Sequence, residues 1–459
     1  MLKKYFGSWD FYKRAMLLTL PIMAQNGITN LVNMLDNVMV GAVGTLPMTG
    51  VTVSNQLLFV FNLCIFGIVS GAGIFSAQFY GNGDTKGVRD SFRLKIILAV
   101  ILSAIGIGVF LVFGENLISL YLKGEGTAED RVATLKYAKD YLNIMLVGLL
   151  PFALTQCWSG TLRECDRPVL PMCAGFVAMG VNMSLNYVLI FGKLGFAPLG
   201  VRGAAIATVI SRFAELLVIA IWTRASAKKN TFILGAFKSF KVPLSLTKDV
   251  LKKGLPLMAN ETMWAMGMAA INQSYSLRGL EVVAATNILQ TFFNVFSVAF
   301  MAVGVAIGII LGQLLGAGEI ETAKDSCRKL TVFTVMVSLF FGALFFVAAA
   351  FIPKIYNTSE NVRVAATHLM QICALAFPID AFAHATYFSM RSGGKTGITF
   401  VFDSGFMWAV SVPLAFVIAN YTALPILPFY AVVQALNIIK CIVGYIFIKK
   451  GYWINRVVA

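Results

Sequence analysis

Long apolar runs recur along the whole chain, and they set its fold class. Each run has about twenty residues or more, the length that a helix needs to cross a bilayer, and no stretch of soluble composition separates them. Twelve spanning helices are predicted, at about residues 15–40, 51–79, 94–113, 139–160, 169–191, 203–223, 250–276, 282–312, 330–351, 365–389, 397–419 and 427–448. The pattern therefore predicts an all-α integral membrane protein.

The sequence repeats itself at a constant offset in residue number. "LPIMA" at 20–24 corresponds to "LPLMA" at 255–259, and "QFYGNGDTKGVRDS" at 78–91 corresponds to "QLLGAGEIETAKDS" at 313–326. Further along, the offset becomes slightly smaller, and "TLRECDRP" at 161–168 resembles "SMRSGGKT" at 389–396. Two homologous six-helix lobes are therefore predicted, at 1–224 and 250–459, with a basic linker at 225–249. Since six is even, both lobes have the same orientation, as in transporters with parallel repeats about an axis along the membrane normal.

The basic residues indicate topology rather than a nucleic-acid role. Lys and Arg number 37 against 21 Asp and Glu. Twelve spans place both termini on one side, where 26 basic residues lie; nine lie on the other side, and Arg212 and Lys440 fall within spans. Basic residues mark the cytoplasmic side of a membrane protein. We therefore expect both termini in the cytoplasm, a location in the bacterial cytoplasmic membrane, and no nucleic-acid partner.

No motif indicates ATP hydrolysis, metal chemistry or a cofactor. "SMRSGGKTG" lacks the first glycine of a phosphate-binding loop and follows a predicted spanning helix rather than a strand. The seven cysteines are scattered without a CxxC pair, which indicates packing residues rather than disulfides or metal ligands. His368 and His384 form no ligand pattern, which argues against an intramembrane enzyme. A secondary transporter driven by an ion gradient is the resulting prediction.

Polar side chains recur at helical spacing inside the predicted spans. They are Asn26, Thr29, Asn30, Asn33, Asp36 and Asn37 in the first span, Asn182 and Asn186 in the fifth, Asn260, Glu261 and Asn272 in the seventh, Asn287, Gln290 and Asn294 in the eighth, and Asp380, His384, Tyr387 and Arg391 in the tenth. Each amide has the alternative role of linking helices by a hydrogen bond. Likewise, Arg212 and Glu215 are spaced for a structural ion pair.

Three acids in these spans are predicted to couple transport to a cation. Asp36, Glu261 and Asp380 have no basic residue one turn away, although an acid at the bilayer centre costs about 2.5 to 3.5 kcal/mol on insertion scales. A carboxylate in a low-dielectric cavity can hold a proton near neutral pH, and with nearby hydroxyls and carbonyls it suits a small cation. Na+ is a candidate ligand at Glu261 and Asp380.

An anionic cavity with aromatic and Met side chains attracts lipophilic cations through charge and cation–π contacts. The residues predicted to line it are Asn33, Asn182, Asn186, Trp264, Asn287, Gln290, His384 and Tyr387.

Several stretches resemble the multidrug and toxic compound extrusion (MATE) family of antiporters. They are "LDNVMVG" at 35–41, "QFYGNGD" at 78–84, "NYVLIFGKLGFAPLGVRGAAIAT" at 186–208 and "GLPLM" at 254–258, and the resemblance covers about residues 10–450. It implies twelve helices in two six-helix lobes around a V-shaped cavity, and export of organic cations in exchange for Na+ or H+.

The resemblance also implies roles for single residues. Asp36 matches the acid of the "DxxMVG" pattern, which belongs to the cation site of the family's amino-terminal lobe. Glu261 and Asp380 match acids in the seventh and tenth helices of NorM-like members. Where some relatives have an aspartate in the fifth helix, this chain has Asn186, so the resemblance does not support a two-carboxylate proton site in the first lobe.

The leading prediction is thus a secondary multidrug antiporter that exports organic cations in exchange for Na+ or H+ and needs no cofactor. The alternative is a flippase or exporter of a lipid-linked precursor or secreted metabolite in the same superfamily, for which a basic cavity would be expected. A passive cation channel is also open, and it could not accumulate substrate against a gradient. A monomer surrounded by membrane lipid is expected, because two lobes enclose their own cavity.

Overall fold

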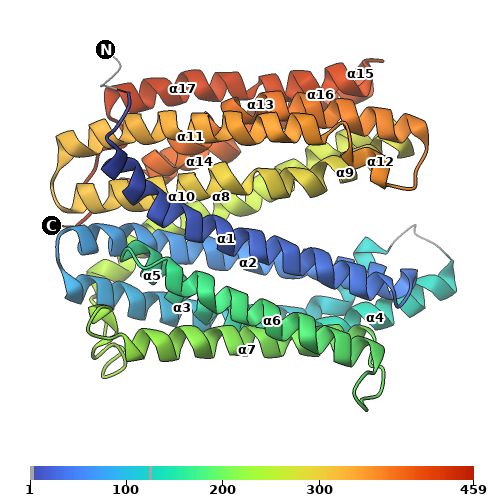
Figure 1. Cartoon of the computed structure of the whole chain (residues 1–459), viewed down its shortest axis with the longest axis horizontal. Helices are drawn as coiled ribbons and strands as arrows, with labels where there is room; N and C mark the ends of the chain where they lie inside the picture. Colours follow the sequence, from blue (N-terminus) through green and yellow to red (C-terminus); the bar gives the residue numbers. More distant parts are fainter. Residues whose placement is uncertain (1–4, 123–126, 459) are drawn as a thin grey trace. The chain divides into compact units, whose positions relative to one another are not determined.

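The protein is helical throughout the described residues, which are 5–122 and 127–458 of a computed structural model. The ends of the predicted lobes, 1–4 and 459, lie outside them. The first half contains α1 (Trp9–Gly41), α2 (Thr45–Gly81), α3 (Thr85–Tyr121), α4 (Ala128–Val147), α5 (Leu149–Glu164), α6 (Val169–Phe191) and α7 (Val201–Ala225), as labelled in Figure 1. A short 3-10 helix, η2 (Thr231–Ile233), lies in the linker.

The second half repeats this order with more interruptions. Its elements are α8 (Leu244–Ser276), α9 (Leu280–Phe296), α10 (Val298–Gly316), α11 (Ile320–Ala348), α12 (Ile352–Ile355), α13 (Glu360–Ser392), α14 (Thr396–Phe400), the π-helical segments η3 (Val401–Gly405) and η4 (Met407–Ser411), α15 (Val412–Tyr421), α16 (Ile426–Ala435) and α17 (Asn437–Lys450).

The predicted all-α membrane fold is confirmed. Every predicted span coincides with a helix or with consecutive helices. Ten of the described helices are long and apolar enough to cross a membrane, or eleven if α4 and α5, which are bent by 49° at their junction, count as one span. The predicted span at 282–312 is divided at Ser297 into α9 and α10.

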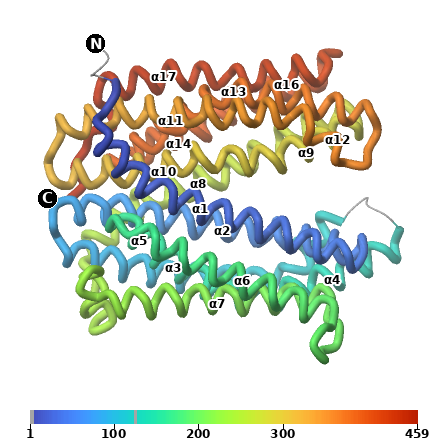
Figure 2. The backbone as a smooth tube through the Cα atoms, in the orientation of Figure 1, coloured from blue at the N-terminus to red at the C-terminus, as the bar shows by residue number. Residues whose placement is uncertain are grey.

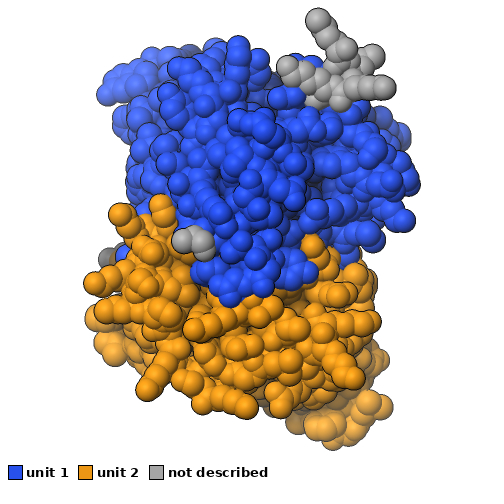
Figure 3. All heavy atoms as spheres, turned by 90° about the vertical axis from the view of Figure 1, so that its left-hand side faces the viewer, with its two compact units in different colours: residues 1–23, 77–84, 255–459 blue, residues 24–76, 85–254 orange. Residues whose placement is uncertain are grey.

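The contacts divide the chain into two compact units, which Figure 3 colours separately. Unit 1 contains the residues up to 23, 77–84 and those from 255 onward; unit 2 contains 24–76 and 85–254. In unit 1, α13 packs against α9, α10, α11 and α17, and Figure 2 shows it running beside α11 and α17. In unit 2, α7 packs against α4, α5 and α6.

The units differ from the two sequence halves because each includes the start of the other half's first helix. Ala15, Leu18 and Ile22 of α1 lie in the core of unit 1 with residues of α10 and α11. In unit 2, Gly71 of α2 faces Gly254 of α8, where an added Cβ would lie 2.4 Å from the Gly254 Cα atom. The sequence repeat thus appears in the packing as an exchange of these two helix starts.

The two copies of the repeated Q-x-x-G motif touch each other within unit 1. A Cβ atom added to Gly81 would lie 1.9 Å from the carbonyl oxygen of Gln313, and one added to Gly316 would lie 1.9 Å from that of Gln78. A reciprocal contact between equivalent residues is the geometry of a two-fold axis. Only glycine permits such an approach of two backbones, which explains why both copies have it.

Replacing either glycine with alanine should destabilise the protein. We expect Gly81→Ala and Gly316→Ala each to lower the thermal unfolding midpoint in detergent, because a methyl group that overlaps backbone atoms costs about 1 to 3 kcal/mol or more. Gly108→Ala in α3 is the matched control. An added Cβ there meets nothing within 4 Å, and alanine favours the helix by about 0.8 to 1 kcal/mol, so its midpoint should stay the same or rise. Equal midpoints for all three variants would contradict the close contact.

Candidate functional site

Polar side chains from three helices meet around Asp36 in unit 2. Asn186 Nδ2 donates to Asp36 Oδ1 at 2.5 Å and to Asn182 Oδ1 at 3.0 Å. Asn182 Nδ2 donates in turn to Thr208 Oγ1 at 3.3 Å, and the Thr208 hydroxyl, which lies near Asp36, donates to the carbonyl oxygen of Ala204 at 2.9 Å. The chain of contacts therefore joins α1, α6 and α7 through one carboxylate.

This cluster has a free acceptor beside the carboxylate. Asn186 is fully buried, yet its Oδ1 atom has no hydrogen-bond partner in the described part of the chain. A buried polar atom without a partner is rare and calls for an explanation such as an ion or a water. Carboxylate, amide and hydroxyl oxygens are ligands that hard cations prefer, so Asp36, Asn186 and Thr208 together form a chemically suitable cation site.

One basic residue lies near this acid. Arg212 of α7 interacts electrostatically with Asp36. Its guanidinium donates to the carbonyl oxygen of Gly148 at 3.2 Å and lies 5.0 Å from the ring centroid of Phe152. Arg212 also interacts electrostatically with Glu215, as its spacing predicts, but the described residues show no contact between the two within 4.0 Å. Arg212 instead holds the junction of α4 and α5.

A second polar cluster, in unit 1, is centred on Asn260. Its Nδ2 donates to Asp403 Oδ2 at 3.2 Å and to Tyr387 Oη at 3.4 Å. Its Oδ1 accepts from the Ser404 backbone N–H at 3.3 Å and from Ser404 Oγ at 2.8 Å. Tyr387 Oη donates to Glu261 Oε1 at 2.8 Å. The amide of Asn260 therefore connects two carboxylates, Glu261 through Tyr387 and Asp403 directly.

The start of α17 supplies the partners of the remaining acids. Asn437 Nδ2 donates to Asp380 Oδ1 at 2.8 Å, and Lys440 Nζ donates to Asp403 Oδ1 at 2.8 Å. Lys440 also interacts electrostatically with Asp380. Asp380 thus belongs to the same network as Glu261, through α17 rather than by direct contact.

The backbone at Asp403 departs from the α-helix. Asp403 and Ser404 lie in η3, and η4 follows one residue later. The wider π turn changes the direction in which side chains leave the helix, and such turns are frequent at functional sites. In this chain, the π segment lets the carboxylate of Asp403 bind Asn260 with one oxygen and Lys440 with the other.

The structure brings most of the predicted site residues into these two clusters. Asp36, Asn182 and Asn186 meet in unit 2, while Glu261, Asp380 and Tyr387 join the network in unit 1. His384 stacks on Tyr387 with ring centroids 6.1 Å apart. In the described part of the chain, Glu261 and Asp380 belong to no group of three or more potential metal-binding side chains.

Other predicted residues lie apart from the clusters. Asn33 and Asn287 have exposed side chains, and Trp264 packs against the hydrophobic core of unit 1. Gln290 is exposed and donates to Asn294 Oδ1 at 3.0 Å. These residues share the helical spacing of the others, but the partners that would draw them into a cluster are on different helices.

Sequence reasoning missed Asp403, Ser404, Asn437 and Thr208, and it noted Lys440 only as a basic residue within a span. The sequence does offer a way to find Asp403, because this residue is an acid inside the predicted span 397–419. A buried ion pair in unit 2 was also missed: Lys95 Nζ lies 2.5 Å from Glu164 Oε2 and also donates to Thr161 Oγ1 at 3.1 Å. Lys95 lies at the start of the predicted span 94–113 and Glu164 lies just beyond the end of the span 139–160, so the sequence alone does not predict that they meet.

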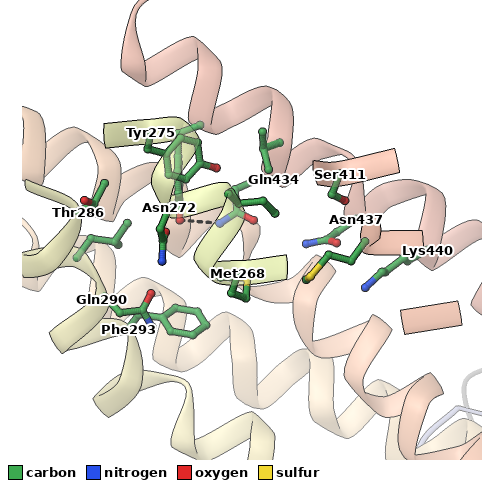
Figure 4. A pocket seen from close by; sticks show the side chains of 15 residues that line it. Met268, Asn272, Tyr275, Thr286, Gln290, Phe293, Ser411, Gln434, Asn437 and Lys440 are labelled. Atoms are coloured by element: carbon green, nitrogen blue, oxygen red, sulfur yellow. Dashed lines mark hydrogen bonds between the residues drawn. The ribbon is translucent and has the colours of Figure 1, made fainter. Parts of the chain in front are cut away.

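A pocket of about 110 Å³ lies beside the network in unit 1 (Figure 4). That volume holds several waters and is smaller than the about 300 to 1,000 Å³ of most pockets for drug-sized ligands. Its polar lining comes from α8, α9, α16 and α17, and includes Asn272, Thr286, Gln290, Gln434, Asn437 and Lys440. Gln434 Nε2 donates to Tyr430 Oη at 2.6 Å. The pocket therefore borders Asp380 and Asp403 through Asn437 and Lys440.

Comparison with known proteins identifies the family. The family model described as MatE matches residues 21–188 and 256–417, two segments that begin at equivalent positions of the internal repeat. The chain belongs to the MATE family. Members of this family are transporters and not enzymes, so the predicted transport class is confirmed.

Relatives of the same length support this assignment. A protein of Thermotoga maritima named "Probable multidrug resistance protein NorM" is 27% identical, over 98% of this chain and 94% of that protein. A protein of Bacillus subtilis named "Probable multidrug resistance protein YoeA" is 25% identical, over 96% of this chain and 95% of that protein.

Solved structures share the fold of this MATE protein. An outward-facing multidrug resistance MATE family transporter of the MOP superfamily has a TM-score of 0.86 at 19% identity, with 98% of this chain and 97% of that chain covered. A MOP superfamily transporter from Pyrococcus furiosus, described as having a binding pocket of reverse polarity, has a TM-score of 0.85 at 19% identity, with the same coverage. At these identities the similarity shows the fold alone.

Asn260 should be essential to the stability of unit 1. We expect Asn260→Leu to lower the thermal unfolding midpoint in detergent, because the leucine leaves Asp403 Oδ2 and the Ser404 N–H without their partner. A buried group that loses its hydrogen bond costs about 1 to 3 kcal/mol. Asn287→Leu, at an exposed position, is the control and should leave the midpoint unchanged. If both variants unfold at the wild-type temperature, the network around Asn260 does not hold the unit together.

Proposed function

We propose that this protein is a secondary multidrug antiporter that exports organic cations in exchange for Na+ or H+. The observation that carries the proposal is the placement of carboxylates within apolar helices, where each is linked to amides or hydroxyls from neighbouring helices. Acids at membrane depth are expensive and are functional by default. Family membership and the names of the relatives support drug efflux as the activity.

In this proposal Asp36, Glu261 and Asp380 bind the coupling cation. Asp36 shares its site with Asn186 Oδ1 and Thr208, so Na+ would find oxygen ligands there, and a proton would bind the carboxylate alone. Glu261 and Asp380 offer Na+ a second site in the carboxy-terminal half. The movement of one charge across 100 mV contributes about 2.3 kcal/mol, which supports an accumulation ratio of roughly fifty.

Aromatic rings near the acids suit an organic cation. His384, Tyr387 and Phe388 form one group of contacting rings, and Tyr387 donates directly to Glu261. Such rings attract a lipophilic cation to a neighbouring carboxylate through cation–π contacts. Trp264 and Gln290 extend the surface available to substrate on α8 and α9.

The proposal includes the cellular arrangement. The protein is a multi-pass monomer of the bacterial cytoplasmic membrane with both termini in the cytoplasm, a topology supported by the 26 to nine distribution of basic residues. The homologous halves, 1–224 and 250–459 joined by 225–249, act as the two lobes that move during alternating access.

Transport in proteoliposomes tests this function. We expect a fluorescent organic cation to accumulate against its gradient when either a Na+ gradient or a proton gradient is imposed, and not without one. Asp36→Asn, Glu261→Gln or Asp380→Asn should reduce driven accumulation at least tenfold, because each amide keeps the shape of the side chain but cannot carry the charge.

Glu115→Gln provides the matched control, because Glu115 is an exposed acid in a surface ion pair with Lys139. It should transport like the wild type. If neither gradient drives accumulation by the wild type, cation antiport is excluded, and a lipid-linked precursor or a secreted metabolite becomes the cargo to test. If a gradient drives transport but all three acid variants match the wild type, these residues do not couple it.

A further inference from the structure

Lys440 is a cation inside a membrane helix, and packing alone does not account for it. Its side chain is 10% exposed, and its ammonium lies 2.8 Å from Asp403 Oδ1 and 5.6 Å from the ring centroid of Phe406. A charged side chain at the helix centre costs about 2.5 to 3.5 kcal/mol on insertion scales. Apolar residues of similar volume would often pack there with equal or greater stability than a buried ion pair.

The three acids of the network in unit 1 differ in how many of their carboxylate oxygens accept a hydrogen bond from the protein. Both oxygens of Asp403 have protein partners: Oδ1 accepts from Lys440, and Oδ2 accepts from Asn260. Glu261 and Asp380 each use one oxygen, toward Tyr387 and Asn437. Among the described residues, the second oxygen of each has no hydrogen-bond partner, although Arg391 interacts electrostatically with Glu261. Both oxygens of Asp403 are therefore bonded to the protein, whereas Glu261 and Asp380 each keep one oxygen available to a ligand.

Lys440 is close to two acids, Asp403 and Asp380, and its side chain lines the pocket. It lines the pocket together with Asn437, which is one helical turn away and binds Asp380 (Figure 4). It interacts electrostatically with Asp380 as well as with Asp403. Its long, flexible side chain is a point charge that can change partners.

The other half has a basic residue at the equivalent position. Arg212 and Lys440 are related by the second, smaller offset of the repeat, which also relates Arg163 to Arg391. Arg212 interacts electrostatically with Glu215 and with Asp36, two acids of its own half. Arg212 lies near the middle of the predicted span 203–223, and Lys440 lies within the predicted span 427–448. Two cations at equivalent positions of the repeat, each beside a membrane acid of its own half, indicate a shared role in charge balance.

We propose that Lys440 is a resident cation of the carboxy-terminal site. Its ammonium occupies the place on Asp403 that a transported cation would otherwise take, and it thereby restricts exogenous cations to Glu261 and Asp380. This inference rests on the proposed cation coupling. It goes further by assigning to Lys440 the role of limiting how many cations the carboxy-terminal half binds.

The test counts bound cations in purified variants reconstituted in nanodiscs. The measurement is the number of Na+ ions bound per protein at saturation, from equilibrium dialysis of radioactive Na+ at pH 8.5. If the proteoliposome assay identifies H+ as the coupling ion, protons bound are counted instead by potentiometric titration. We expect Lys440→Met to bind one cation more than the wild type, since it exposes Asp403, and Lys440→Arg to bind the wild-type number.

Two further variants keep the test decisive if Lys440→Met does not fold. Asp403→Asn should bind one cation fewer than the wild type, because Lys440 then turns to Asp380. The double variant Asp403→Asn with Lys440→Met should return to the wild-type number. A wild type that couples to neither ion contradicts the proposed function before any variant is compared.

An ordinary structural ion pair gives a different result. In that case, Asp403→Asn and Lys440→Met would lower the thermal unfolding midpoint and leave the number of bound cations at the wild-type value. Unchanged counts in folded Asp403→Asn protein would overturn the proposal.

Discussion

The close crossing of the two Q-x-x-G motifs is the constraint on which unit 1 depends. At Gly81 and Gly316 the backbones approach until no side chain fits between them. The side chain of Gln78 then binds the carbonyl oxygens of Ser392 and Asn455 and the N–H of Val457, while Gln313 accepts from Arg14. The end of α13, the carboxy-terminal segment and the start of α1 are therefore fixed to one point, from which α13 carries Asp380, His384 and Tyr387.

The two halves repeat the same order of helices, but the acids of their polar clusters are not at equivalent positions. At the offset that aligns the two Q-x-x-G motifs, Gln25 corresponds to Asn260, and both amides are buried at hydrogen-bonding positions. Asn26, however, corresponds to Glu261, and Asp36 corresponds to Ile271 in the hydrophobic core of unit 1. The cluster in the amino-terminal half thus has one acid, Asp36, among amides, and the network in the carboxy-terminal half has three acids. Two halves with similar helices can move alike while they bind cations differently.

The sequence predicted the helices better than the site, because a membrane span is determined by length and apolar content alone. The predicted span 169–191 coincides with α6, whereas the span predicted from 139 began too late, since α4 starts in a polar stretch that a capping box at Thr127 stabilises. Helical spacing identifies which residues share a face but not which faces meet. Asp403 lies in a π segment, where the α-helical period does not apply, and its partners come from other helices, with Asn260 143 residues away and Lys440 37 residues away. Only the folded chain brings these residues together.

Two of the buried ion pairs, Lys95 with Glu164 and Lys440 with Asp403, have different surroundings. Lys95 is completely buried and also binds Thr161, and Gly73 must lack a side chain because a Cβ there would lie 2.4 Å from Glu164 Oε1. That pair is enclosed, and a change of partner would leave a buried charge unpaired, which is strongly destabilising. Lys440 and Asp403 make a pair of similar geometry, but Lys440 borders a pocket and faces a second acid. The pair that joins α3 to α5 is therefore fixed by its enclosure, whereas Lys440 stays beside a pocket and a second acid while it holds Asp403.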